Sequence, residues 1–308
     1  RLDGVTGVQT CALPICSLLV SQIARAARKL NMAWPIVWVA CPVACDVAIG
    51  MRKGALVYQR TDRFEEYPNV DSDVIRRCDE RLKDDADLTV YVSRSLYEAE
   101  RRQCRKAMYM DHGVDFSLFA GAQDQDVAPE DIRGIRRPIV GFFGGIDSHT
   151  SDIPFLEQMV GLLPDVSFVF VGRASCDVSG LVAHSNVHML GQKPYEQIPA
   201  YGRRFDVAIM VWNQNHWIDG CNPVKLKEYL ALGKPVVSTP FPQLQEYADV
   251  VYQAGTPAEF ASRVRQALAE DSPERASARR NRVQNATWDA KAELILQELA
   301  SNVFREAN

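Results

Sequence analysis

Short apolar runs recur along this chain, and most are followed by a segment whose apolar residues have helical spacing. The runs predict strands at residues 35–40, 56–58, 88–92, 107–110, 138–143, 167–171, 186–191, 205–211, 235–237 and 250–252, of which those at 35–40, 138–143 and 235–237 are expected to be buried. The segments predict helices at residues 17–30, 70–86, 93–101, 153–163, 194–201, 223–232, 257–269, 274–286 and 290–304. Strands that alternate with helices favour parallel, helix-covered sheets, which is the α/β class.

The pattern is interrupted once, at residues 118–137, where Gly, Gln, Asp, Ala and Pro lack an apolar period and predict a linker. We therefore expect a first α/β domain at residues 17–117 and a second at 138–288, followed by a final helix within 289–308. A chain of 308 residues is long enough for two domains.

Composition excludes several classes of protein. The net charge of −4 gives no reason to propose a nucleic-acid partner. No apolar run reaches the roughly 20 residues that cross a bilayer. The eight cysteines lack the paired spacing of a zinc site. We therefore expect no metal site and reduced thiols in a cytoplasmic protein.

Residues 222–239 carry the most informative pattern of the chain. Asn222 is suited to cap a helix that starts at Pro223, and Gly233 is suited to end it before the strand at 235–237. The amino end of such a helix offers free N–H groups and a positive dipole, which suit an anionic phosphate.

Lys225 and Glu228 are three residues apart near the start of this helix and share one of its faces. Lys225 would add a full positive charge, and Glu228 would accept hydrogen bonds from sugar hydroxyls. From the spacing alone, a solvated Lys/Glu pair on an ordinary surface helix is as well supported as a ligand site.

The segment resembles the nucleotide-binding signature of GT-B glycosyltransferases, which are built from two Rossmann-like domains. It is most similar to bacterial envelope and exopolysaccharide enzymes of group 1 (family 4-like), including the xanthan-type glucuronosyltransferase. The resemblance implies that Glu228 binds the ribose and Lys225 the diphosphate. Many retaining members carry a second glutamate eight positions earlier, where this chain has Gly220, with Asp219 adjacent.

The second domain opens with a buried strand that runs into Gly144 and Gly145. Glycines at such a turn let the backbone approach a ligand and point N–H groups at it. The dinucleotide fingerprint Gly-x-Gly-x-x-Gly is absent. Arg173 follows the next strand and could reach a base or a phosphate, although an arginine at a strand end is often only solvated.

A polar and aromatic loop at residues 212–221 leads into the 223–232 helix. Ligands of doubly wound sheets bind beyond the carboxyl ends of the strands, and this loop leaves such an end. Asn215, His216 and Asp219 are therefore candidates for contact with the donor sugar or its diphosphate. A mobile surface loop is an equally favoured interpretation.

In the first domain, Asp62 lies where envelope-type members place an aspartate that faces the acceptor. A carboxylate there can take the proton from an attacking hydroxyl. The alternative is a loop aspartate that caps a helix or pairs with Arg60 or Arg63. His112 is a further polar residue at a strand end.

Residues 1–15 resemble a translated sequencing adapter, so we treat 1–16 as a non-native leader and expect a first domain truncated at its amino end. A signal peptide is the competing interpretation, but a basic n-region before a continuous apolar core is missing. The family usually packs its final helix, here within 289–308, back on the first domain.

The resemblance implies metal-independent transfer of a sugar from a nucleoside-diphosphate sugar, expected to be a UDP-sugar, to a hydroxyl of a glycan or lipid-linked acceptor. It implies no cofactor. The basic helix at 17–30 could also touch a membrane surface, which would add a peripheral contact at the inner membrane face. The alternatives are a nucleotide-sugar-binding fragment without turnover and a GT-B UDP-sugar epimerase.

Overall fold

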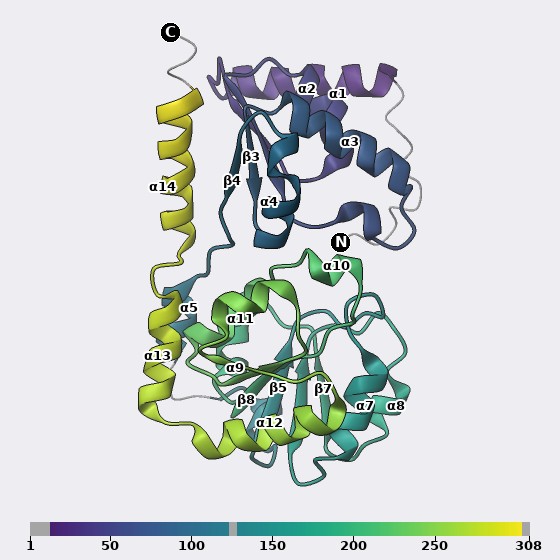
Figure 1. Ribbon diagram of the computed structural model, residues 1–308, viewed down its shortest axis with the longest axis vertical. Coiled ribbons are helices and arrows are strands. Elements are labelled where there is room, and N and C mark those ends of the chain that lie inside the picture. Colours follow the sequence, from purple (N-terminus) through teal and green to yellow (C-terminus); the bar gives the residue numbers. More distant parts are fainter. Residues whose placement is uncertain (1–12, 123–127, 304–308) are drawn as a thin grey trace. The chain divides into compact units, whose positions relative to one another are not determined.

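The computed structural model describes residues 13–122 and 128–303 (Figure 1). They form two compact units. Unit 1 comprises the described residues up to Asp111, together with Asp219–Asn222 and those from Ala292 onward. Unit 2 comprises the described residues of His112–Ile218 and Pro223–Lys291. Every strand predicted from the sequence overlaps an observed strand.

Unit 1 contains one parallel sheet of four strands in the order β1-β2-β3-β4. The strands are β1 (Ile36–Val39), β2 (Ala55–Arg60), β3 (Leu88–Tyr91) and β4 (Ala107–Tyr109). The helices are α1 (Leu13–Lys29), α2 (Cys45–Gly50), α3 (Ser72–Asp85) and α4 (Arg94–Glu100), with 3-10 turns at Pro42–Ala44, Phe64–Glu66 and Arg101–Gln103.

The core of unit 1 lies on both faces of this sheet, because alternate residues of a strand point to opposite sides. Leu56 and Tyr58 of β2 pack with residues of α2 and α3 on one face. Val57 packs on the other face with Ile295 of α14 (Trp288–Glu298) and with Leu299. The part of α14 from Ala292 onward therefore belongs to unit 1, where Lys106 also pairs with Glu298 at 2.8 Å.

The strand predicted at 35–40 forms, but the expectation that it is buried is wrong. In β1, Ile36 is 39% and Trp38 is 44% exposed, and only Val39 is buried. The reason is position, because β1 pairs with β2 alone and forms an edge of the described sheet. Residues 1–12 of the expected leader lie outside the described residues, and α1 includes residues 13–16.

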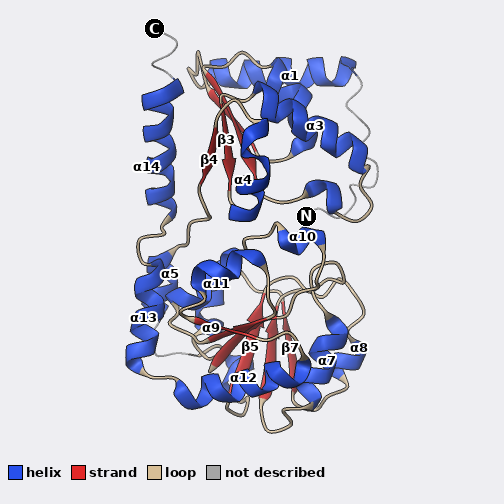
Figure 2. Ribbon diagram, viewed as in Figure 1, coloured by secondary structure: helices blue, strands red, loops and turns tan. Residues whose placement is uncertain are grey.

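Unit 2 contains a parallel sheet of six strands in the order β10-β9-β8-β5-β6-β7. The strands are β5 (Ile139–Phe143), β6 (Ser167–Val171), β7 (Val187–Gly191), β8 (Val207–Met210), β9 (Val236–Ser238) and β10 (Val251–Gln253). Figure 2 shows this sheet enclosed by helices, and all residues of β5, β6, β8 and β9 are buried.

The longer helices of unit 2 are α7 (Ile153–Gly161), α11 (Val224–Ala231), α12 (Pro257–Glu270) and α13 (Pro273–Val283). Short helical segments are α5 (Phe116–Gly121), α6 (Glu130–Arg133), α8 (Ser179–Val182), α9 (Ile198–Gly202), α10 (His216–Asp219), and the 3-10 turns Tyr195–Gln197 and Pro242–Tyr247. Thus α5 and α6 lie within or beside the range predicted as a linker, and α10 lies within the predicted 212–221 loop. Each is a single turn or little more, too short to show an apolar period.

Candidate functional site

The order of the strands in unit 2 reverses between β5 and β8. From β5 the chain moves through β6 to β7 on one side, and from β8 through β9 to β10 on the other. In open α/β sheets, ligands bind at such a reversal, beyond the carboxyl ends of the strands. Here those ends lead into Gly144 after β5 and Trp212 after β8.

Gly144 forms a tight turn against the end of β6. Its N–H donates to Val171 O at 2.9 Å, and its φ of +134° is one that side chains rarely adopt. A Cβ added to Gly172 would lie 1.9 Å from Gly144 O, so glycine is needed at both positions, directly after β5 and β6. Gly145 differs, because a Cβ there would meet no atom within 4 Å.

Lys225 of α11 reaches this turn, as the predicted site requires. Its Nζ would lie 2.7 Å from a Cβ placed on Gly144. The same Nζ lies 4.5 Å from the ring centroid of Phe142 and 4.6 Å from that of Trp212. The ammonium is thus held at the reversal point, over two aromatic faces.

Glu228 lies one turn further along α11 and is 7% exposed. Its Oε1 accepts a hydrogen bond from the Tyr195 hydroxyl at 2.9 Å. Burial raises the pKa of Glu228, and the bond from Tyr195 and the charge of Lys225 oppose that rise in part. The sequence did not indicate this role of Tyr195, because the two residues are 33 positions apart.

The start of α11 differs from its prediction. The cap position is Pro223 with ψ 121°, and no side chain caps the helix. Asn222 is wrong as the N-cap, because its amide instead donates to Val92 O at 2.7 Å within unit 1. Gly233 ends the helix as predicted, with φ +72°.

The remaining donor-side candidates are more exposed. Arg173 is exposed, and its carbonyl accepts from Ile146 N at 3.0 Å, which ties the two loops together. His216 is exposed at the start of α10. Asp219 is exposed and belongs to unit 1, where its carbonyl accepts from Ser95 Oγ at 2.7 Å. Their contact with a donor stays a prediction.

Asp62 of unit 1 follows β2 and is half-buried. Burial raises its pKa to about 6, while hydrogen bonds from Cys221 and Thr61 and the charge of Arg60 oppose the rise. Cys221 Sγ donates to Asp62 Oδ1 at 3.5 Å. Arg60 forms its ion pairs with Glu65, Asp79 and Glu100.

Within residues 13–122 and 128–303, no group of three or more His, Cys, Asp or Glu is placed to hold a metal ion. None of the helices described over those residues combines the length and the apolarity that crossing a bilayer requires.

Comparisons with known proteins agree with the fold. Residues 137–270 match the family described as "Glycosyl transferases group 1". A curated relative, named as the teichuronic acid biosynthesis glycosyltransferase TuaH of Bacillus subtilis (strain 168), is 27% identical over an alignment that covers 62% of this chain and 50% of TuaH. The alignment thus spans about half the length of this relative.

Among solved structures, Anabaena HepE in complex with UDP and glucose is similar, with a TM-score of 0.73 and 17% identity over 96% of this chain and 84% of HepE. Sucrose-phosphate synthase from Thermosynechococcus elongatus gives a TM-score of 0.71 and 17% identity, over 95% of this chain and 79% of that one. The predicted fold class is therefore confirmed: two parallel-sheet α/β units of the GT-B type.

Proposed function

We propose that this protein is a glycosyltransferase that moves a sugar from a UDP-sugar to a hydroxyl acceptor in polysaccharide or cell-envelope glycan synthesis. The observation that carries the proposal is the placement of Lys225 Nζ at the Gly144 turn, where the strand order of unit 2 reverses. The family match over residues 137–270 and the UDP bound to HepE support it.

In the proposed reaction, an acceptor hydroxyl attacks the anomeric carbon of the donor. A carbon–oxygen bond forms to the acceptor, and the bond to the diphosphate breaks. Lys225 stabilises the charge that develops on the leaving diphosphate, assisted by the amides of Gly144 and Gly145. Glu228 accepts hydrogen bonds from the ribose, and no metal or cofactor takes part.

Asp62 is the proposed base that removes the proton of the acceptor hydroxyl. With a pKa of about 6 it is ionised at neutral pH, yet basic enough to take a proton in the transition state. The proposal further gives Arg173 and Asn222 to the nucleotide diphosphate, and His216 and Asp219 to the donor sugar. The proposed acceptor is a glycan or a lipid-linked molecule. The proposed place of action is the cytoplasmic side, with a peripheral contact to the membrane.

Calorimetric titration with UDP tests the donor site directly. Lys225→Ala should weaken binding about 10- to 100-fold, because a charge-assisted contact with phosphate is lost. Glu228→Ala should weaken it about 10-fold, through the ribose contacts. Arg265→Ala is the matched control, because it removes a cation of unit 2 that pairs with Asp165 on the surface.

Unchanged UDP affinity in both site variants would contradict the donor site. Binding of UDP without release of UDP from any UDP-sugar, with or without acceptor, would favour the alternative of a binding protein without turnover. Interconversion of UDP-sugars would instead favour an epimerase.

A further inference from the structure

The aromatic rings beside Lys225 are not assigned a role by the proposed function. We propose that Phe142 and Trp212 are positioning residues: together they form an aromatic clamp that holds the Lys225 ammonium at the Gly144 turn, ready for the diphosphate of the donor. This inference rests on the proposed function, and it identifies the residues that position Lys225, the cation on which that function depends.

The geometry of the aromatic clamp is that of a cation enclosed by two rings. Lys225 Nζ lies 4.5 Å from the centroid of Phe142 and 4.6 Å from that of Trp212, inside the range of about 6 Å for a cation–π contact. The two rings stand edge to face, with centroids 6.2 Å apart and an interplanar angle of 76°. Their faces therefore bound the ammonium from two directions.

The two rings are buried, and the backbone of Trp212 is anchored on both sides. Phe142 and Trp212 are each 6% exposed. Trp212 N donates to Thr239 Oγ1 at 2.9 Å, directly after the end of β9. Trp212 also forms an isolated antiparallel β-bridge with Ser151. A lysine has four rotatable bonds and loses much conformational freedom when it is ordered. Fixed rings beside its ammonium limit that freedom before the donor arrives.

A second observation at Trp212 points to a ligand. Its indole Nε1 is buried, and no atom of the described residues accepts a hydrogen bond from it. Buried polar groups in folded proteins almost always have a partner, so such an N–H requires an oxygen that the described part of the chain does not supply. A phosphate or sugar oxygen of the donor has the right chemistry, since indole donates but cannot accept.

A double-mutant cycle separates positioning of Lys225 from general packing. UDP affinity is measured by calorimetry on the full chain and on Trp212→Leu, Lys225→Met and the double variant. If the ring acts through the lysine, Trp212→Leu should weaken UDP binding about 10-fold alone, but only about 3-fold when Lys225→Met is also present, because the N–H contact with the donor is then all that is lost. Equal factors in the two backgrounds would overturn the proposal.

Conservative variants test the ring itself. Trp212→Phe keeps an aromatic face but has a smaller ring and no N–H, so it should recover the part of the affinity lost in Trp212→Leu that depends on the ring face. Phe142→Leu should weaken binding about 3- to 5-fold and serves if Trp212→Leu does not fold. Equal losses in Trp212→Phe and Trp212→Leu would contradict a role for the ring face.

Phe155→Leu is the matched control. Phe155 is 8% exposed, lies on α7 and packs on Phe260 with ring centroids 5.6 Å apart. The rings in cation–π contact with Lys225 are those of Phe142 and Trp212. Phe155→Leu should lower the melting temperature as Phe142→Leu does, without changing UDP affinity. Failure of the proposed function is recognised separately: Lys225→Met would then bind UDP as the unmodified chain does, whereas failure of the aromatic clamp leaves Lys225→Met weakened.

Discussion

Each of the two units holds a cation near the carboxyl ends of its strands, but the groups that surround the two cations differ. In unit 2, Lys225 lies over the rings of Phe142 and Trp212. In unit 1, Arg60 ends β2 and is 1% exposed among the carboxylates of Glu65, Asp79 and Glu100. The rings attract a cation without carrying a formal charge, whereas the carboxylates around Arg60 carry formal charges opposite to its own. The first arrangement suits a phosphate ligand, and the second suits stability.

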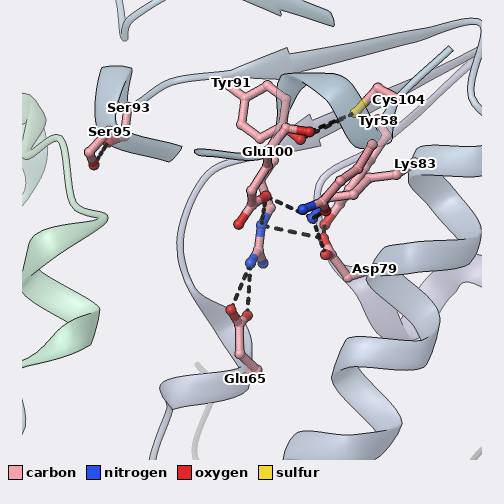
Figure 3. A network of polar contacts seen from close by, with 11 residues as sticks. Tyr58, Glu65, Asp79, Lys83, Tyr91, Ser93, Ser95, Glu100 and Cys104 are labelled. Atoms are coloured by element: carbon pink, nitrogen blue, oxygen red, sulfur yellow. Dashed lines mark hydrogen bonds and ion pairs between the residues drawn. The ribbon is translucent and has the colours of Figure 1, made fainter. Parts of the chain in front are cut away.

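The network of unit 1, drawn in Figure 3, includes further contacts. Lys83 pairs with Asp79 at 2.6 Å and with Glu100 at 2.7 Å. The Tyr58 hydroxyl donates to Asp79 Oδ1 at 2.5 Å. Burial alone would raise the pKa of Glu100, but the charges of Arg60 and Lys83 outweigh it, so that this pKa lies below its ordinary value. The members come from β2, the 3-10 turn Phe64–Glu66, α3 and α4, so the network joins four elements.

The largest effect is expected from breaking this network. Arg60→Met removes the cation shared by three carboxylates, of which Lys83 pairs with only two, and should lower the free energy of unfolding by about 3–5 kcal/mol. Chemical denaturation of the full chain at pH 7 measures it. The control is Arg76→Met on α3, whose pairing with Asp73 is exposed and should contribute about 0–1 kcal/mol. Similar losses for the two variants would contradict the assigned role.

The pH dependence of this loss has a definite sign. Glu100 has a folded pKa below 4.5, so its stabilisation is present above the unfolded pKa and is lost as pH falls through the folded one. The difference between the unmodified chain and Arg60→Met should therefore shrink as the pH is lowered below about 4.5. A difference that grows toward acid would contradict this account.

Asp62 lies two residues beyond Arg60 and has the opposite shift. Its raised pKa of about 6 means that it costs stability as pH rises from about 4 to 6, because the folded state binds the extra proton. As the proposed base it should make turnover rise with pH through about 6. Asp62→Asn should lower turnover about 100-fold and remove that rise, while raising the melting temperature at pH 7.

Release of UDP from donor and acceptor, followed between pH 5 and 8, measures the profile of Asp62→Asn. UDP affinity provides the internal control, because the substitution lies outside unit 2 and should leave it unchanged. Retained turnover with an unaltered pH profile would remove Asp62 from the role of base.

The strands and the donor-side helix were predictable from the sequence because their signals are local. The run at residues 139–143 and the helix ended by Gly233 depend on neighbours within a few positions. The Arg60 network was not predictable, since its partners include Glu100, 40 residues away. Asn222 was assigned a local capping role, but a carbonyl 130 positions away uses its amide.

The smallest effect is expected from substitutions of Gly144 and Gly145, two glycines that the sequence alone does not distinguish. Gly144→Ala would place a Cβ 2.7 Å from Lys225 Nζ at a φ of +134°, whereas Gly145→Ala meets no atom within 4 Å. Gly144→Ala should therefore weaken UDP binding about 10-fold by displacing the ammonium from the aromatic clamp, with an added cost in backbone strain. Gly145→Ala should change affinity less than about 2-fold, because its N–H is retained. UDP affinity is measured by calorimetry on the two variants. Equal losses of affinity would contradict this account, because they would show that Gly144 is not required specifically to leave space for Lys225.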